Sequence, residues 1–266
     1  MRPEERWTAI LDRLAASEHV STKDLSTELG VTSVTVRTDL RLLEEDGRLR
    51  RVHGGAVPAS HVLETSHDDR GGVDDAQKVA IAALAATLLE PGMTVVLDVG
   101  TTTLALAEHI SNNAAIAGLR IVTNGLRQAS CLEAAMPRNE VYVTGGELRP
   151  MQHSLVQSGV VEGLSRFHAD LAFIGCDGVD PAHGVTTTNL PEADVKEAMR
   201  RLSQRSVLLA AASKLGEVAS VRVNTVGEFD TLITSADADP ERLAKLERLG
   251  LGVLVAPPVT DRKDAR

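Results

Sequence analysis

The chain has 266 residues, 43% of them hydrophobic and 2% aromatic, and its formal net charge is −9 at pH 7. This length has room for two domains, and this hydrophobic fraction can form a packed core, which excludes a disordered chain. The first residues are too charged to begin a signal peptide, and no apolar run reaches the roughly 18 residues that a membrane span needs, so we expect a cytoplasmic protein without membrane contact.

Residues 1–57 predict a winged helix-turn-helix. Apolar side chains at helical spacing indicate a helix over residues 3–18, and Ser21 can cap a second helix that closes at Gly30. A third helix follows the cap candidate Ser33. A short helix, a tight turn and a second helix are typical of a helix-turn-helix, and the strand-like pieces around the next glycine pair would form a wing.

The third predicted helix has one apolar and one polar face. On a helical wheel Val36, Leu40 and Leu43 fall together and face the domain core. Hydroxyl and arginine side chains lie opposite them or on the flanks, where they can reach base edges and phosphates. Arginines and a histidine in the wing would contact phosphate or the minor groove. The candidate DNA-binding residues are Ser33, Thr35, Arg37, Thr38, Arg41, Arg50, Arg51 and His53. Asp39 flanks the inward face and is expected to pair with an arginine.

Charge alone does not separate a DNA-binding unit from any small three-helix domain with a solvated charged face. Residues 1–57 carry nine basic and ten acidic side chains, so most of the net negative charge lies in the remainder of the chain. The stretch VTSVTVRTDLRLLEEDGRLRRVHGGA, however, resembles the signature of the DeoR family, V-S-x-x-T-I-R-R-D-L followed by L-E-x-x-G and R-x-H-G-G-A. The resemblance implies binding to double-stranded operator DNA. Thr32 replaces the usual serine and Thr38 the usual second arginine, so the operator sequence is not implied.

The remainder predicts a linker and an α/β domain. Residues 58–75 lack periodicity and form the expected linker, residues 76–256 alternate short aliphatic runs with helical patterns, and residues 257–266 are expected to be a mobile tail. Such alternation is typical of a parallel sheet covered by helices on both faces. The expected strands are 94–97, 119–123, 141–144, 171–175, 206–210, 231–234 and 252–255, and the expected helices are 76–90, 126–136, 190–203 and 239–249. Cys131 and Cys176 lie far apart, so we expect buried, unbridged thiols and no structural zinc.

Polar or glycine-rich loops follow several of the predicted strands. The carboxyl ends of the strands in an open α/β sheet line one crevice, so we expect these loops to gather there. Glycines, threonine hydroxyls and a helix N-terminus suit an anion such as phosphate, although each loop alone could be an ordinary strand-to-helix turn. One lysine and several carboxylates nearby favour a phosphorylated sugar or polyol. The candidate effector-binding residues are Asp98, Gly100, Thr101, Thr102, Thr103, Thr123, Asn124, Gly145, Gly146, Asp177, Glu192 and Lys214.

A second resemblance covers residues 70–255. The stretches LDVGTTT, VTNGL, VTGGELR, DLAFIGCDGVD, EADVKEAM and SKLG are similar to the DeoR sensor domain. The resemblance implies an α/β open-sheet sensor domain of the phosphosugar isomerase type behind the winged helix-turn-helix. Ala211 stands where the family usually has the aspartate of D-x-S-K, so no particular ligand is implied.

These patterns predict a transcriptional repressor of sugar or polyol catabolism genes that a phosphorylated sugar relieves. We expect a homo-oligomer, dimer or tetramer, without metal, cofactor or catalytic residues. Two alternatives stay open. Asp177, Asp180 and Glu192 resemble the acidic set of the phosphate isomerases, which would make the chain an enzyme, although the lysine that follows this set in those enzymes has no counterpart here. In the other alternative the C-terminal half only oligomerises.

Overall fold

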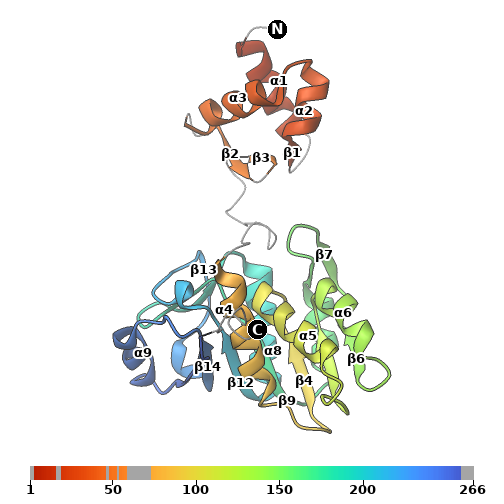
Figure 1. The fold of residues 1–266 in the computed structure, drawn as a ribbon, viewed down its shortest axis with the longest axis vertical. Coiled ribbons are helices and arrows are strands. Elements are labelled where there is room, and N and C mark those ends of the chain that lie inside the picture. Colours follow the sequence, from red (N-terminus) through yellow and green to blue (C-terminus); the bar gives the residue numbers. More distant parts are fainter. Residues whose placement is uncertain (1–2, 16–18, 46–47, 53, 59–72, 259–266) are drawn as a thin grey trace, which may run out of the picture. The chain divides into compact units, whose positions relative to one another are not determined.

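The computed structural model describes residues 3–15, 19–45, 48–52, 54–58 and 73–258. The chain divides into two compact units, residues 1–69 and 70–266 (Figure 1). Within the described ranges, no helix combines the length and the apolar character that crossing a membrane requires.

The N-terminal unit combines three helices with a small antiparallel sheet. Its elements are α1 (Pro3–Ala15), β1 (Val20–Ser21), α2 (Thr22–Leu29), α3 (Ser33–Glu45), β2 (Leu49–Val52) and β3 (Gly55–Pro58). Strands β2 and β3 form the expected wing, and β1 adds a third strand beside β3 that the sequence pattern did not predict. The predicted winged helix-turn-helix is confirmed.

The helix ends of this unit follow their local chemistry. Ser21 caps α2, since its Oγ accepts a hydrogen bond from the backbone nitrogen of Asp24 (3.1 Å), and Gly30 closes the helix in the left-handed region with φ 64°. The expectation that Ser33 caps α3 is wrong by one residue. Thr32 Oγ1 instead accepts from the backbone nitrogen of Thr35 (3.2 Å), so Ser33 is already the first helical residue.

A buried ion pair joins the first and third helices. Val36, Leu40 and Leu43 are buried as predicted, and Asp39 lies among them with 3% of its surface exposed. Its carboxylate accepts two hydrogen bonds from the guanidinium of Arg6, at 2.7 and 2.9 Å, and one from the indole of Trp7 at 2.9 Å. The predicted pairing of Asp39 with an arginine is therefore confirmed, and it fixes α1 against α3.

The C-terminal unit is a seven-stranded parallel sheet between two layers of helices. The sheet runs in the order β15-β14-β12-β9-β4-β5-β6. Its strands are β4 (Thr94–Leu97), β5 (Arg120–Thr123), β6 (Glu140–Val143), β9 (Ala169–Gly175), β12 (Ser203–Leu209), β14 (Thr231–Thr234) and β15 (Gly252–Val255). The helices are α4 (Val73–Ala86), α5 (Thr101–Asn112), α6 (Leu126–Leu132), α7 (Ser158–Leu164), α8 (Leu190–Leu202) and α9 (Pro240–Glu247), with short 3-10 turns at η2 (Glu133–Ala135), η3 (Ala212–Lys214) and η4 (Val226–Glu228). The expected α/β class and all seven expected strands are confirmed.

Each face of the sheet has its own hydrophobic cluster. Helices α4, α5 and α6 pack on one face and α7, α8 and α9 on the other, and Figure 1 shows α4 and α5 in front of the sheet with α8 behind it. Successive strand residues supply opposite clusters: in β4, Val96 faces α7 and α8, while Val95 and Leu97 face α4 and α5. All of β4 is thus buried, which explains why its last three residues, Val95, Val96 and Leu97, are all apolar.

Some boundaries differ from the pattern. Helix α4 begins at Val73, inside the segment expected as linker, and ends at Ala86 rather than at residue 90. The amides of Thr87 and Leu88 bond to carbonyls three residues back, so the last turn tightens and the helix stops. Two groups of short strands were not predicted, because strands of three or four residues leave little pattern in the sequence. The first is the hairpin of β7 (Glu147–Arg149) with β8 (Ser154–Val156), and the second is the sheet of β10 (Gly178–Asp180), β11 (Gly184–Thr187) and β13 (Val221–Asn224).

Candidate functional site

The outward face of α3 presents the side chains expected to meet DNA. Ser33, Arg37, Thr38 and Arg41 are exposed, and Thr35 is half-buried. Val34 lies in their midst with 68% of its surface exposed. A helix with an exposed valine, hydroxyls and arginines on one face can offer apolar and polar contacts to base edges and cations to phosphates.

The wing is attached to α3 through Glu44. Its Oε1 accepts a hydrogen bond from the backbone nitrogen of Arg51 in strand β2 (2.7 Å). The Arg51 side chain is exposed, as is that of Arg48. Arg50 pairs with Val57 through its backbone, while its side chain and His53 lie outside the described residues. The structure thus brings Arg51 and the α3 face into one unit.

In the C-terminal unit, β4 and β9 are neighbours at the point where the strand order reverses. The chain steps outward from β4 to β5 and β6, then returns to β9 on the other side of β4. Ligands of open α/β sheets bind at the carboxyl ends of such a strand pair. Asp98 directly follows β4, and its Oδ2 accepts from the backbone nitrogen of Gly175 (3.0 Å) and from Lys196 Nζ on α8 (2.5 Å). The predicted Asp98 therefore lies at the switch point itself.

The Asp98–Lys196 pair is enclosed by protein. Their side chains are 1% and 4% exposed. Burial raises the pKa of Asp98, and the nearby ammonium group only partly opposes this. Burial lowers the pKa of Lys196, but the carboxylates of Asp98 and Glu192 outweigh it and raise that pKa above its usual value. The pair therefore holds its proton tightly, and Asp98 Oδ1 finds no hydrogen-bond donor among the described residues.

Glu192 and Asp177 complete the acidic part of this site. Glu192 Oε1 accepts from Arg149 Nη1 (2.8 Å) and from Ser154 Oγ (3.2 Å), so it links α8 to the β7–β8 hairpin. Asp177 Oδ2 accepts from the hydroxyl of Thr187 and from the backbone nitrogen of Thr188, both at 3.1 Å. Both predicted carboxylates are therefore oriented by bonds to their own chain.

Lys214 lies near the end of β9. It is half-buried on η3, and both its ammonium group and that of Lys196 act electrostatically on Cys176. Burial nevertheless raises the pKa of Cys176 to about 12, so this thiol stays neutral. Cys176 and Cys131 are half-buried rather than fully buried, and both are unbridged. We call the following seven side chains the switch-point cluster: Asp98, Arg149, Cys176, Asp177, Glu192, Lys196 and Lys214.

The predicted residues at the carboxyl end of β5, Thr123 and Asn124, are buried and hold loops together. Asn124 Oδ1 accepts from the backbone nitrogen of Val99, and Asn124 Nδ2 donates to the carbonyl oxygen of Leu155, both at 3.1 Å. Thr123 Oγ1 accepts from the backbone nitrogen of Gly125 (3.1 Å). These side chains fix the loops that surround the cluster.

The start of α5 divides the predicted G-T-T-T loop into buried and accessible parts. Thr103 is fully buried and donates its hydroxyl to the carbonyl of Gly100 (2.9 Å), which also accepts from Gln128 Nε2. Thr101 and Thr102 are partly exposed, and Gly100 stands at the N-cap without a side chain to satisfy the first amides. Thr101 and Thr102 can therefore offer hydroxyl and amide donors to an anion.

Gly145 and Gly146 turn the chain from β6 into the hairpin that carries Arg149. Both are exposed, with φ of 72° and 119°. A Cβ on Gly146 would come within 2.6 Å of the carbonyl oxygen of Val156, so this turn requires a glycine. Their role in the structure is thus to aim the hairpin.

Sequence reasoning missed Lys196 and Arg149. A usable signal existed for Lys196: it lies four residues after Glu192 and beside Val195 and Met199, so it belongs to the inward face of α8. Arg149 gave no comparable signal, because its contact with Glu192 joins positions 43 residues apart.

Asp180, the third residue of the isomerase-like acidic set, has another role. Its Oδ1 accepts from the backbone nitrogens of Ala182 and His183 and contacts His183 Nδ1 at 2.8 Å. Burial alone would raise the pKa of Asp180, but the bonds to His183 and Ala182 outweigh burial and lower this pKa below its usual value. It therefore caps the β10–β11 turn. Within the described residues, no group of histidine, cysteine or carboxylate side chains is arranged to hold a metal ion.

A winged helix-turn-helix joined to a sensor-type α/β unit defines a DNA-binding transcriptional regulator. The family profile "DeoR-like helix-turn-helix domain" matches residues 6–62, and "DeoR C terminal sensor domain" matches residues 74–236. The HTH-type transcriptional regulator GlpR of Haloferax volcanii is 36% identical over 255 residues, which cover 96% of this chain and 98% of that protein. The chain belongs to the DeoR family, and it is a regulator rather than an enzyme.

Two further similarities concern more distant proteins. The glycerol-3-phosphate regulon repressor of Escherichia coli K12 is 29% identical over 238 residues, which cover 89% of this chain and 92% of that protein. The ribose 5-phosphate isomerase A of Methanocaldococcus jannaschii superposes with a TM-score of 0.38 and 16% identity, over 53% of this chain and 54% of that one.

Proposed function

We propose that this regulator represses genes of sugar or polyol catabolism and that a phosphorylated sugar or polyol relieves the repression. The observation that carries the proposal is the position of the switch-point cluster, where the carboxyl ends of β4 and β9 meet beside the open start of α5. A similar chain is named for glycerol 3-phosphate, a phosphorylated polyol.

For DNA, the proposed contacts come from α3 and the wing. Arg37 and Arg41 extend from the exposed face of α3, and Val34 offers an apolar surface of the kind that thymine methyl groups contact. Arg51, an exposed side chain of the wing, would contact phosphate. Thr35 and Thr38 have hydroxyls on the same face, although each is also bonded within the helix region.

For the effector, one part of the proposed site would bind the phosphate group and another part would bind the sugar hydroxyls. The amides and hydroxyls at Thr101 and Thr102 suit the phosphate, together with the ammonium group of Lys214. The carboxylates of Asp177 and Glu192 suit sugar hydroxyls, which can donate hydrogen bonds to them.

The proposed mechanism is a population shift. A symmetric homo-oligomer, dimer or tetramer, presents paired winged helices to a palindromic or repeated operator. The effector binds one arrangement of the oligomer more tightly and so lowers the population that fits DNA.

Replacing Arg41 with alanine should weaken operator binding about tenfold or more, because a lost base or phosphate contact costs about 1–3 kcal/mol. The measurement is fluorescence anisotropy at fixed salt, with DNA fragments selected from the source genome. Arg13→Ala is the matched control, since Arg13 is an exposed arginine of α1 that pairs with Glu28. Equal affinities of the Arg41 and Arg13 variants would contradict the α3 interface.

Replacing Lys214 with alanine should weaken the effector response and leave operator binding unchanged in the absence of effector. A thermal-shift panel of sugar phosphates measures the first effect, because a ligand at 100 times its Kd adds about 2.7 kcal/mol of stability. Lys245→Ala, at an exposed lysine of α9, is the control. Loss of DNA binding in a folded Lys214 variant would refute this division of roles, and no stabilisation of the unmodified chain by any phosphate would favour a purely oligomerising domain.

A further inference from the structure

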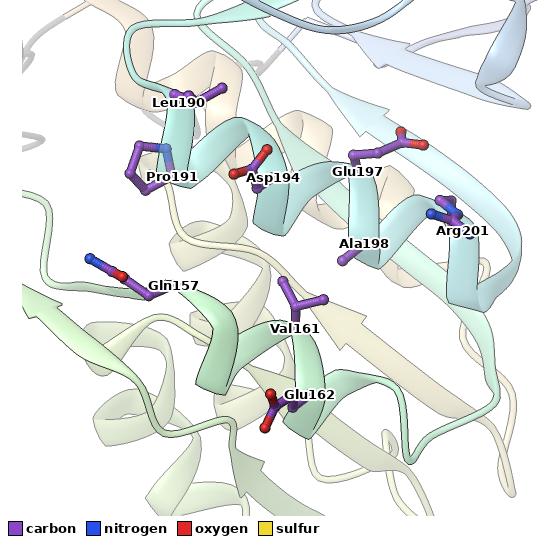
Figure 2. A pocket seen from close by; sticks show the side chains of 9 residues that line it. All are labelled: Gln157, Val161, Glu162, Leu190, Pro191, Asp194, Glu197, Ala198 and Arg201. Atoms are coloured by element: carbon purple, nitrogen blue, oxygen red, sulfur yellow. The ribbon is translucent and has the colours of Figure 1, made fainter.

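An open groove of about 690 Å³ runs between α7 and α8 on the outer side of the C-terminal unit (Figure 2). Its apolar surface comes from Val161 on α7 and from Leu190 and Ala198 on α8. Leu190 has 61% of its surface exposed, so a large apolar side chain stands open to water at the start of α8. Covering this leucine with another protein surface would remove apolar area from water, which is favourable.

The α8 side of the groove is a single stripe of the helix. Leu190, Asp194, Ala198 and Arg201 follow one another at intervals of four, four and three residues, which places them on one face. The stripe carries opposite charges at Asp194 and Arg201, which lie seven residues apart, or about 10 Å along the axis. Between them stands the small side chain of Ala198, which allows another helix to approach closely.

This charge pattern is complementary to itself when reversed. In two antiparallel copies of the stripe, the acidic end of each meets the basic end of the other. Glu162 on α7 adds a second carboxylate on the far side of the groove, so the groove attracts the basic end of an incoming helix. Glu197 adds little net charge, because Arg200 of the same helix donates to both of its oxygens at 2.8 Å.

We propose that this groove is the contact between two copies of the chain, packed about a two-fold axis with their α8 helices antiparallel. Asp194 of each copy then meets the partner's Arg201, and Ala198 lies near the axis. In this register Leu190 faces the chain just beyond the end of the partner's α8. The inference deepens the proposed function, since it assigns a surface to the homo-oligomer on which that mechanism rests.

Helix α8 connects the proposed contact to the effector site. The opposite face of the same helix carries Glu192 and Lys196, which belong to the switch-point cluster. The proposed interface and the effector site therefore lie on two sides of one helix. A ligand that shifts α8 at Glu192 and Lys196 would shift the two-fold contact directly.

Reversing one charge should break the contact, and reversing both should restore it. Asp194→Arg brings arginines together across the axis and Arg201→Asp brings carboxylates together, and like charges across an interface are strongly unfavourable. We expect each single variant of the full chain to associate about tenfold or more weakly, so that its average mass falls at concentrations where the unmodified chain is still associated. The double variant D194R/R201D regains opposite charges and should recover the original mass.

Sedimentation equilibrium at low salt measures these masses, and thermal melts confirm that each variant is folded. Glu108→Arg, at an exposed residue of α5 on the other side of the sheet, is the control and should keep its mass. Single variants that keep the original mass would overturn the interface, as would a double variant that stays as dissociated as the single ones. Operator and effector binding by the unmodified chain test the proposed function separately, so that either idea can fail alone.

Discussion

Replacing Lys196 with methionine will lower the free energy of unfolding of the C-terminal unit by about 3–5 kcal/mol, because removing one member of a buried ion pair leaves the other uncompensated. Methionine preserves most of the side-chain volume, so the loss reports on charge rather than on a cavity. The stranded group is Asp98, which is fully buried and already has one oxygen without a donor among the described residues.

The loss will depend on pH in a defined direction. Burial already raises the pKa of Asp98, and without the ammonium group of Lys196 that pKa rises further. The folded variant then binds a proton more tightly than the unfolded chain does. The relevant pH window lies between the usual aspartate pKa and the raised pKa of Asp98. Within it the free energy of unfolding of the variant increases as the pH is lowered and decreases as the pH rises.

The double variant D98N/K196M is the matched control. It removes both charges, so no ion remains stranded, and its free energy of unfolding should lie much nearer that of the unmodified chain. This variant should also lack the gain in stability that Lys196→Met shows as the pH is lowered. Far-UV circular dichroism monitors the unfolding transition of the C-terminal unit. Trp7, the single tryptophan of the chain, follows the N-terminal unit by fluorescence, and its transition should not move. A Lys196→Met variant as stable as the double variant at neutral pH would show that no charge is left stranded when Lys196 is removed.

The architecture could be predicted because its signals are local. Strand β4 is buried on both faces, so Val95, Val96 and Leu97 form an unbroken apolar run, and the same holds for the core of β9. The inward face of α3 repeats every three or four residues, which identified Val36, Leu40 and Leu43 without any knowledge of their partners.

The site was less predictable because its contacts are not local. Asp98 was singled out as a polar residue after a strand, but its partner Lys196 follows 98 positions later, and only the fold brings them together. Asn124 and Thr103 were expected to touch the effector, whereas the structure has them bonded to the surrounding loops. Sequence reasoning grouped these residues by their place after the strands, and it could not separate the side chains that hold the loops from those that stay accessible. Effector binding at this edge stays a prediction.

The neighbouring glycines of the wing will respond differently to substitution. Overpacking a well-packed site costs about 1–3 kcal/mol, and Gly55→Ala should destabilise the N-terminal unit by at least this much. A Cβ at Gly55 would lie 1.9 Å from the carbonyl oxygen of Val20 and 2.8 Å from His19 Nε2, and the first of these is the backbone of β1. Because β1 pairs with β3 at this point, the backbone has to move and the small sheet opens. The measurement is chemical denaturation followed by Trp7 fluorescence.

Gly54 supplies the matched comparison, since it needs a glycine for a different reason. Its φ is 80°, and apart from its chain neighbours no described atom lies within 4 Å of the place that a Cβ would take. Gly54→Ala should therefore cost only the roughly 1–2 kcal/mol of a left-handed alanine. Asparagine tolerates that conformation, so Gly54→Asn should recover part of the loss, whereas Gly55→Asn should be at least as damaging as Gly55→Ala. Equal losses at the two positions, or recovery by asparagine at Gly55, would show that backbone conformation rather than the approach of β1 to β3 sets the requirement for both glycines.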